Sequence, residues 1–365
     1  MFRLASLVIN PETLALIAEI DANGQLHVGP RSAGSNPGPI CYGRGGKEVT
    51  VTDANLVMHR LALRKPLGGK IKPKIDAVRP AMQALAKRVG VRDEHEMASG
   101  IVKIAVAKMV ASIREISVSR GHDPRECTLV AFGGAGPMHA TAVANELHIP
   151  SVLVPAFAGN LSALGLLTSD IRHDLVETVL EHNRPEAMPR IAAATRRMRD
   201  QARGRLLDEG FNEEVISYAA AVDMRYRGQA FEVAIPLVSE NMMDGIPDAD
   251  ALMVTFHKTY ASLYGHANTD QEAEIVNVRL VGSAHTMKPT IKNPTKPGDA
   301  LIGKRMVYFD RPVDDVPIYD RDLLTPDKRI VGPAIVEELG ATTVISPGWS
   351  FRRDELDNLR IDRVG

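Results

Sequence analysis

The chain has 365 residues, of which 44% are hydrophobic and 24% are charged, and its formal net charge is −1. This length predicts two or three domains, and the chain is long enough to bury a sizeable core. The lack of a basic excess argues against a dedicated nucleic-acid binder, and the longest apolar runs, such as residues 218–222, are far shorter than the roughly 20 residues of a membrane span.

The chain has two cysteines, Cys41 and Cys127. This number excludes a disulfide scaffold and a cysteine-rich zinc site, and it fits a reducing compartment. The first ten residues contain one arginine and too short an apolar stretch for a secretion signal. We therefore expect a cytoplasmic globular protein without a membrane segment.

Glycine and proline interrupt the first ninety residues. Residues 14–20 predict a strand, and residues 25–28 its hairpin partner after a turn at 21–24. Seven glycines and three prolines within residues 24–46 then argue against regular structure. A linker would contain more Ser, Lys and Glu, so we favour an ordered loop in which glycines let the backbone approach a ligand. Cys41 in this loop is more typical of a buried structural thiol than of a nucleophile.

The strongest helix prediction covers residues 93–119. Asp93 and Glu96 form a capping box, and Gly121 ends the helix. Apolar residues recur at helical spacing and predict a core-facing stripe: Met97, Ile101, Ile104, Ala105, Met109, Ile113 and Ile116.

A strand–turn–helix–strand pattern follows. Residues 128–132 predict an apolar strand, 133–137 a tight turn, 138–147 a helix and 151–154 the next strand. This βαβ unit implies a buried pair of largely parallel strands.

The pattern changes after about residue 185. Helices are predicted at 188–209 and 249–264, and strands at 217–226, 231–237 and 275–281. From residue 304 onward, short strands and turns of proline and glycine predict a mostly β module.

The turn made by Gly133, Gly134, Ala135 and Gly136 is the most informative segment. Glycines allow a ligand to come close, and free N–H groups at a helix start favour anionic or polar atoms. The turn does not match G-x-G-x-x-G, and no Walker-type Gly-Lys-Ser/Thr occurs in the chain. Tight packing between strand and helix explains these glycines equally well, so both interpretations stay open.

Three polar side chains are candidates for chemistry. Asp53 stands where a strand leads into a helix, and it is equally well explained as a helix cap. His139 begins the helix after the glycine turn, where it is either packed or in a polar or metal-binding role. His173 neighbours Asp174, but adjacent strand residues point to opposite faces, so His173 needs a metal partner from elsewhere. Asp53 and His139 are thus the catalytic candidates, and Asp53, His139 and His173 the metal candidates.

Several motifs, taken together and in order, resemble the hydantoinase A/oxoprolinase family. They are Gly29-Pro30-Arg31-Ser32-Ala33-Gly34, residues 37–43, Thr50-Val51-Thr52-Asp53-Ala54-Asn55, and residues 131–139, 161–165, 170–174, 225–229, 264–267 and 332–349. The resemblance covers nearly the whole chain.

The resemblance implies an ATP-using enzyme with the two-lobed fold of sugar kinases, actin and heat-shock chaperones. The fold class is then α/β, or α+β overall. Residues 1–183 would form the second lobe of the actin/kinase-like domain, and residues 184–365 the family's C-terminal domain, which is mixed and mostly β. In that fold the glycine turn faces the adenosine of ATP, so Gly133, Gly134, Ala135 and Gly136 would bind the nucleotide, with Mg or another divalent metal beside it.

The family also implies a reaction. Its members open cyclic amides such as hydantoins or 5-oxoproline, and relatives carboxylate ketones such as acetone or acetophenone. Both reactions phosphorylate an amide or enolate-like oxygen. We therefore expect a subunit or C-terminal portion of an ATP-dependent cyclic amide hydrolase. The alternatives are a subunit of an ATP-dependent ketone carboxylase and a non-catalytic assembly module.

One departure from the family matters. Members usually begin with a first lobe that opens on an Asp-x-Gly-Gly-Thr phosphate loop, and this motif is absent from the sequence. Because phosphoryl transfer depends on positioning and charge stabilisation, we expect the isolated chain to be inactive or weak. The expected partners are a hydantoinase B-type subunit, a chain that supplies the missing lobe, or both.

Overall fold

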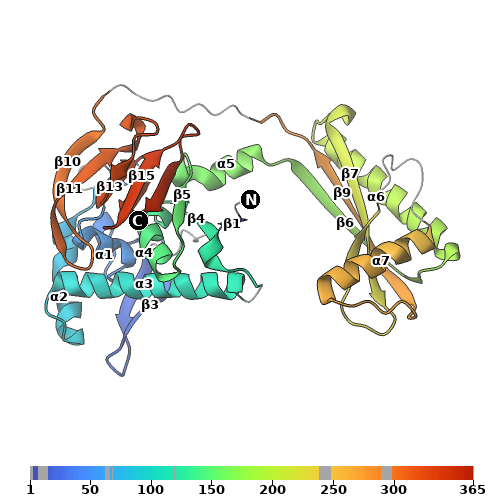
Figure 1. Cartoon of the computed structure of the whole chain (residues 1–365), viewed down its shortest axis with the longest axis horizontal. Coiled ribbons are helices and arrows are strands. Elements are labelled where there is room, and N and C mark those ends of the chain that lie inside the picture. The colour runs from blue at the N-terminus through green and yellow to red at the C-terminus, as the bar shows by residue number, and fades with distance from the viewer. Residues whose placement is uncertain are drawn as a thin grey trace. The chain divides into compact units, whose positions relative to one another are not determined.

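The computed structural model describes residues 3–6, 15–61, 66–67, 69–118, 121–237, 248–288 and 298–364. The chain divides into two compact units (Figure 1): Met1–Gly165 with Ile291–Gly365 form the first, and Leu166–Thr290 form the second. These bounds differ from those of the predicted sequence domains, 1–183 and 184–365, because the C-terminal strands belong to the same unit as the N-terminal half.

A six-stranded sheet organises the first unit. Strands β4 (Cys127–Val130) and β5 (Ser151–Val154) run parallel, and α4 (Gly136–Glu146) connects them, which confirms the predicted βαβ unit. The sheet order is β1-β4-β5-β16-β15-β12. The other four strands are β1 (Arg3–Ser6), β16 (Leu359–Arg363), β15 (Trp349–Arg353) and β12 (Ile330–Val331). Because β16 pairs antiparallel with β5, the last strand of the chain completes a sheet begun by the N-terminal half.

A second sheet of the first unit confirms the predicted β-rich C-terminal region. Its order is β10 (Leu301–Tyr308), β11 (Pro312–Asp320), β13 (Ala334–Glu338) and β14 (Ala341–Ile345). All its pairs are antiparallel except β11 with β13. Helix α4 is fastened to this sheet by the Thr141 hydroxyl, which donates a hydrogen bond of 3.0 Å to the carbonyl of Val344.

Three helices and a hairpin complete the first unit. They are α1 (Val51–Val57), α2 (Ile75–Val89), α3 (Glu94–Ser117), and the strands β2 (Leu16–Ile20) and β3 (Leu26–Ser32). Asp93 caps α3 by accepting hydrogen bonds from the amides of His95 and Glu96, which is half of the predicted capping box. The Glu96 carboxylate accepts from the amide of Arg92 rather than from that of Asp93. The predicted stripe of α3 is buried at Met97, Ile101, Ala105, Met109 and Ile113, whereas Ile104 is half-buried and Ile116 in the last turn is exposed. The predicted ends of the strand at residue 14 and of the helix at residue 119 lie outside the described residues.

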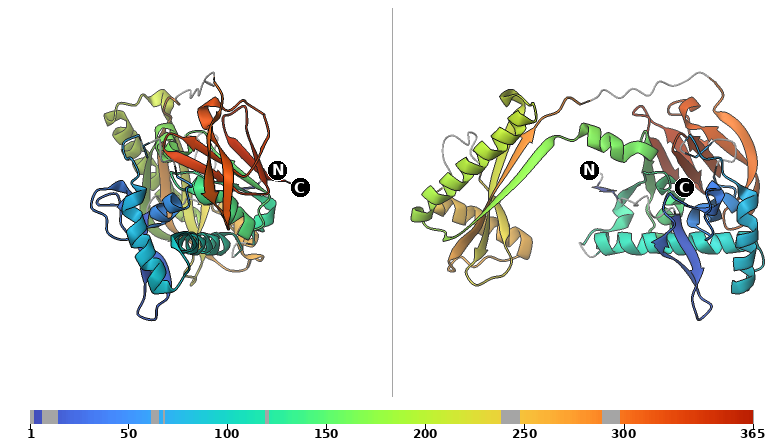
Figure 2. Two further views of the ribbon diagram at one scale, coloured as in Figure 1. Left: turned by 90° about the vertical axis from the view of Figure 1, so that its left-hand side faces the viewer. Right: turned by 180° about the vertical axis from the view of Figure 1, so that it is seen from behind.

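The second unit is a four-stranded antiparallel sheet with two helices. The sheet order is β6 (Ile171–His182), β9 (Ala273–Ala284), β7 (Ile216–Tyr226) and β8 (Val233–Pro236), and the helices are α6 (Met188–Asp208) and α7 (Ala249–Tyr264). One hydrophobic core joins both helices to one face of the sheet. Figure 2 shows the ribbon of these elements from behind. Helix α5 (Leu161–Thr168) spans the boundary between the units. Within the described part of the chain, no helix combines the length and apolarity needed to cross a bilayer.

Candidate functional site

Five separate stretches of the chain line a cavity of about 230 Å³ in the first unit, one of them through Pro66, Leu67 and Ile71. The glycine-rich loop contributes Tyr42, α1 contributes Thr52, and the glycine turn contributes Gly134. The end of β13, the start of β14 and their connection supply the remaining residues, Glu337, Glu338, Gly340, Ala341 and Thr342. The structure thus brings together four segments that the sequence analysis singled out separately. We call this space the turn cavity.

The glycine turn leads from β4 into α4 as predicted. Gly133 has a φ of +80°, which favours glycine because other side chains are strained there. Its N–H donates a hydrogen bond of 2.7 Å to the carbonyl of Ala158. Helix α4 starts behind Ala135, and this N-cap residue has no side chain that accepts a hydrogen bond from the first turn. Such an uncapped helix start favours the polar or anionic atoms of a ligand.

A contact between two glycines fixes the far wall of the turn cavity. A Cβ on Gly159 would lie 2.6 Å from the carbonyl oxygen of Gly340, so only glycine fits at position 159. Gly159 neighbours Ala158, the residue that accepts the hydrogen bond of Gly133. The glycine turn and the β13–β14 connection are therefore held by the same short segment.

The glycine-rich loop is ordered, as predicted, but it contains more regular structure than its glycines and prolines suggest, because β3 extends to Ser32 and a 3-10 turn covers Ile40–Tyr42. A Cβ on Gly46 would lie 2.2 Å from the carbonyl oxygen of Gly38, which shows how closely the loop folds on itself. Cys41 in this loop is fully buried and unpaired. Burial, together with the charge of Asp53, raises the pKa of the Cys41 thiol far above its usual range, so it is a structural thiol rather than a nucleophile.

Asp53 holds this loop against α1. Its carboxylate oxygens accept hydrogen bonds of 2.8 Å from the amide of Cys41 and of 2.9 Å from the amide of Thr50. The hydroxyl of Thr50 donates a third, of 2.8 Å, and the two residues form a capping box. Burial raises the pKa of this carboxyl, and the hydrogen bonds from Cys41 and Thr50 oppose the rise. Asp53 therefore helps to cap α1 as the third residue of the helix, whereas the N-cap itself, which the sequence offered as one explanation of Asp53, is Thr50.

His139 lies in the buried face of α4, one residue after Met138, which lines the turn cavity. Neither ring nitrogen has a hydrogen-bond partner among the described residues. Burial, assisted by the positive charge of Arg60, lowers the pKa of His139 to about 3, so the imidazole is neutral near pH 7.

His173 lies on β6 in the second unit, whereas Asp53 and His139 belong to the first. Its Nε2 atom is 3.0 Å from a carboxylate oxygen of Glu209. Nowhere in the described ranges do three or more His, Cys, Asp or Glu side chains gather in a group that could hold a metal ion.

Two carboxylates of the turn cavity were not among the predicted site residues. Glu337 is 2.9 Å from Arg305, and Glu338 is 2.6 Å from Arg321. Burial raises the pKa of Glu338, and the charge of Arg321 opposes the rise. The signal in the sequence that could have identified them was two adjacent glutamates at the end of a buried strand, because buried carboxylates need partners of opposite charge.

Two family models match consecutive parts of the chain. Residues 14–175 match the family model described as Hydantoinase/oxoprolinase, and residues 179–363 match the one described as Hydantoinase/oxoprolinase C-terminal domain. Among curated proteins, the chain is similar to caprolactamase subunit alpha of Pseudomonas jessenii, with 34% identity over 97% of this chain and 52% of that protein. The acetophenone carboxylase gamma subunit of Aromatoleum aromaticum is 31% identical over 91% of this chain and 47% of that protein. For 5-oxoprolinase 1 of Arabidopsis thaliana the identity is 28%, over 93% of this chain and 28% of that protein.

Two solved structures share the fold. The ATP-dependent caprolactamase from Pseudomonas jessenii has a TM-score of 0.73 at 32% identity, over 96% of this chain and 52% of that one. A nucleotide-free acetone carboxylase has a TM-score of 0.82 at 23% identity, with the same coverage, 96% and 52%. The chain therefore spans about half the length, or less, of the relatives it matches.

Proposed function

The chain belongs to the hydantoinase/oxoprolinase family, and on that premise we propose that it is a subunit or C-terminal portion of an ATP-dependent cyclic amide hydrolase. The observation that carries the proposal is the convergence of four family motifs on the turn cavity. The similarity to caprolactamase subunit alpha, at 34% identity, supports an amide as the substrate class.

The turn cavity is proposed to hold the adenosine part of ATP. Gly134 brings backbone rather than a bulky side chain to its wall. Gly133, Ala135 and Gly136 adjoin it in the chain, and the uncapped start of α4 would meet polar atoms of the ligand there. Leu61, Leu67 and Met138 offer apolar walls on which a flat base can pack.

ATP with a divalent metal such as Mg supplies the phosphoryl group that activates an amide oxygen in this class of reaction. This chain's share is to bind and orient the nucleoside. Asp53 and His139 remain proposed catalytic and metal-binding residues, since each neighbours a residue of the turn cavity, Thr52 or Met138. His173 remains a candidate metal ligand of the second unit. The phosphates and the metal would then be gripped largely by groups outside the described residues.

We propose that the chain acts with a partner. Relatives are named as alpha and gamma subunits, which supports an assembly of several chains. A hydantoinase B-type subunit, or a polypeptide with an Asp-x-Gly-Gly-Thr loop, would complete the active enzyme. Residues 1–183 and 184–365 would be its two sequence modules, and a reducing cytoplasm would suit two buried, unpaired cysteines.

Nucleotide binding tests the proposal. The variant Gly134→Asp places a carboxylate in the turn cavity, and we expect it to weaken ATP binding by at least about tenfold in calorimetric titration. Gly204→Asp is the matched control, because position 204 on α6 has open space around a Cβ. Wild-type protein that binds no ATP even with its partners present would leave only the assembly module.

The substrate class is tested on the complex. We expect a hydantoin or a lactam to stimulate ATP hydrolysis, and acetone or acetophenone with bicarbonate to leave it unchanged. The opposite pattern would assign the chain to a ketone carboxylase instead.

A further inference from the structure

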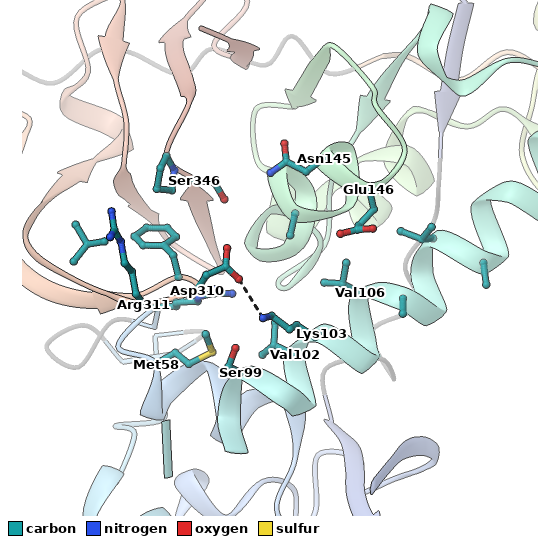
Figure 3. Close-up of a pocket in the computed structure, with 18 of the residues that line it drawn as sticks. Met58, Ser99, Val102, Lys103, Val106, Asn145, Glu146, Asp310, Arg311 and Ser346 are labelled. Atoms are coloured by element: carbon teal, nitrogen blue, oxygen red, sulfur yellow. Dashed lines mark ion pairs between the residues drawn. The ribbon is translucent and has the colours of Figure 1, made fainter. Parts of the chain in front are cut away.

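A larger cavity, of about 930 Å³, lies between α3, α4 and the turn that joins β10 to β11. Figure 3 shows α3 contributing Val102, Lys103 and Val106, while Asn145 and Glu146 come from α4. None of its lining residues lines the turn cavity, so the two spaces are distinct. Small-molecule sites typically measure about 300–1,000 Å³. We call this second space the α3 pocket.

One wall of the α3 pocket is an apolar stripe. Val102, Val106 and Val110 recur every fourth residue on α3 and therefore lie on one side of the helix. Ala142 of α4 and Val313 of β11 also line the pocket. This wall suits a hydrocarbon group.

Arg60 places a buried cation at the same pocket. Its side chain lines the space, yet the residue is only 7% exposed. The Nε atom donates a hydrogen bond of 3.0 Å to the carbonyl of Tyr308, and the guanidinium lies 5.8 Å from the centre of the Phe309 ring. No described residue accepts a hydrogen bond from either Nη atom.

The charge of Arg60 is costly where it lies. Burial lowers its pKa to about 10, and only the charge of Asp310 opposes this, so the group remains protonated at neutral pH. Asp310 cannot neutralise it fully, because its side chain is 89% exposed and lies 3.3 Å from Lys103, the pair drawn in Figure 3. A desolvated cation without a close counter-charge is stabilised by an anion that enters the pocket.

The remaining charges of the α3 pocket favour the same kind of ligand. Its lining includes four cationic side chains, Arg60, Lys103, Arg114 and Arg311, against two anionic ones, Glu146 and Asp310. The surplus of positive charge selects for a negative group.

We propose that the α3 pocket binds a small-molecule carboxylate with an apolar body. The carboxylate would accept hydrogen bonds from the two Nη atoms of Arg60, since the guanidinium fork matches a carboxylate in shape. The apolar body would lie along the valines of α3. A small molecule suits the space better than a peptide, because α3, α4, the β10–β11 turn and residues 346–347 bound it on several sides.

Calorimetric titration of the 365-residue chain with octanoate tests this. Octanamide is the matched neutral probe, and we expect it to bind at least about tenfold more weakly than octanoate, because it lacks the charge that Arg60 pairs with. Absence of octanoate binding, or equal binding of both probes, would overturn the proposal.

Three variants test whether octanoate binds in the α3 pocket. Ala107→Phe fills the space from an exposed position of α3 that lines it, and we expect it to abolish octanoate binding. Ser112→Phe adds the same ring at an exposed position of α3 that does not line the pocket, and should bind octanoate like the wild type. Arg60→Met should remove the preference for octanoate over octanamide. Octanoate binding that survives Ala107→Phe would place any site elsewhere and refute the assignment.

Discussion

At the scale of single residues, His139 is a clear case of a polar side chain that is buried without hydrogen-bond partners in the described part of the chain. An imidazole without hydrogen-bond partners in a buried helix face costs free energy, and it costs more once protonated. Its pKa of about 3 means that the folded protein resists a proton that the unfolded chain accepts near pH 6.5.

This difference predicts an acid-sensitive stability. Above about pH 6.5 both states hold a neutral His139, so its contribution is fully present, and it is lost as the pH falls from about 6.5 toward 3. The slope from this one group approaches about 1.4 kcal/mol per pH unit. Urea unfolding between pH 7 and pH 4 should show a shallower pH dependence for His139→Gln than for the wild type. His148→Asn, at an exposed position, is the control and should keep the wild-type slope. Identical slopes for all three proteins would contradict the burial of His139.

The residue scale also shows what sequence could and could not predict. Asp53 was recognised as important, but cap and site were equally good explanations, because one strand–helix junction serves both. Only the tertiary position of Cys41, whose amide donates to Asp53, shows that the carboxylate holds the glycine-rich loop. The burial of Arg60 was not predicted from the sequence, because it depends on Tyr308 and Phe309, about 250 residues away in the chain.

At the scale of elements, close backbone contacts position the walls of the turn cavity. Gly159 touches Gly340, and the neighbouring Ala158 accepts a hydrogen bond from Gly133. A shift of this segment therefore moves both the glycine turn and the β13–β14 connection.

The variant Gly159→Ala tests this coupling. Its methyl group would overlap the backbone of Gly340, and relief of the overlap should cost about 1–3 kcal/mol of stability. We expect weaker ATP binding as well, although position 159 does not line the turn cavity. Gly204→Ala adds the same methyl group in open space and should be neutral or slightly stabilising. Unchanged stability and ATP binding in Gly159→Ala would show that the contact does not constrain the site.

Local patterns predicted most elements but not their partners. The βαβ unit and α3 follow from hydrophobic periodicity and capping, which are properties of neighbouring residues. The pairing of β16 with β5 depends on residues about 200 positions apart, and no local pattern encodes it. For this reason the sequence placed the last strands in a C-terminal module, whereas they fold with the N-terminal half.

At the scale of the whole molecule, the chain has two hydrophobic cores, and the stretch that forms one core is inserted in the sequence between the two parts that form the other. One core contains Ile101 of α3 together with Ile335 and Phe351 from the last strands. The other contains Phe256 of α7 and belongs to the inserted stretch Leu166–Thr290. Each unit therefore has its own core.

Truncation of each core should therefore destabilise its own unit, and for the first core that unit is not contiguous in the chain. Ile101→Ala should cost about 2–5 kcal/mol and raise amide hydrogen exchange both around α3 and in residues 301–363, while residues 171–284 keep their protection. Phe256→Ala should cost about 3–5 kcal/mol and do the reverse. Mass spectrometry of peptides from both variants measures the two patterns against the wild type. If Phe256→Ala exposed residues 301–363 while Ile101→Ala left them protected, the C-terminal strands would belong with the second core, and the turn cavity could not be completed by Glu337 and Glu338 in the way the structure shows.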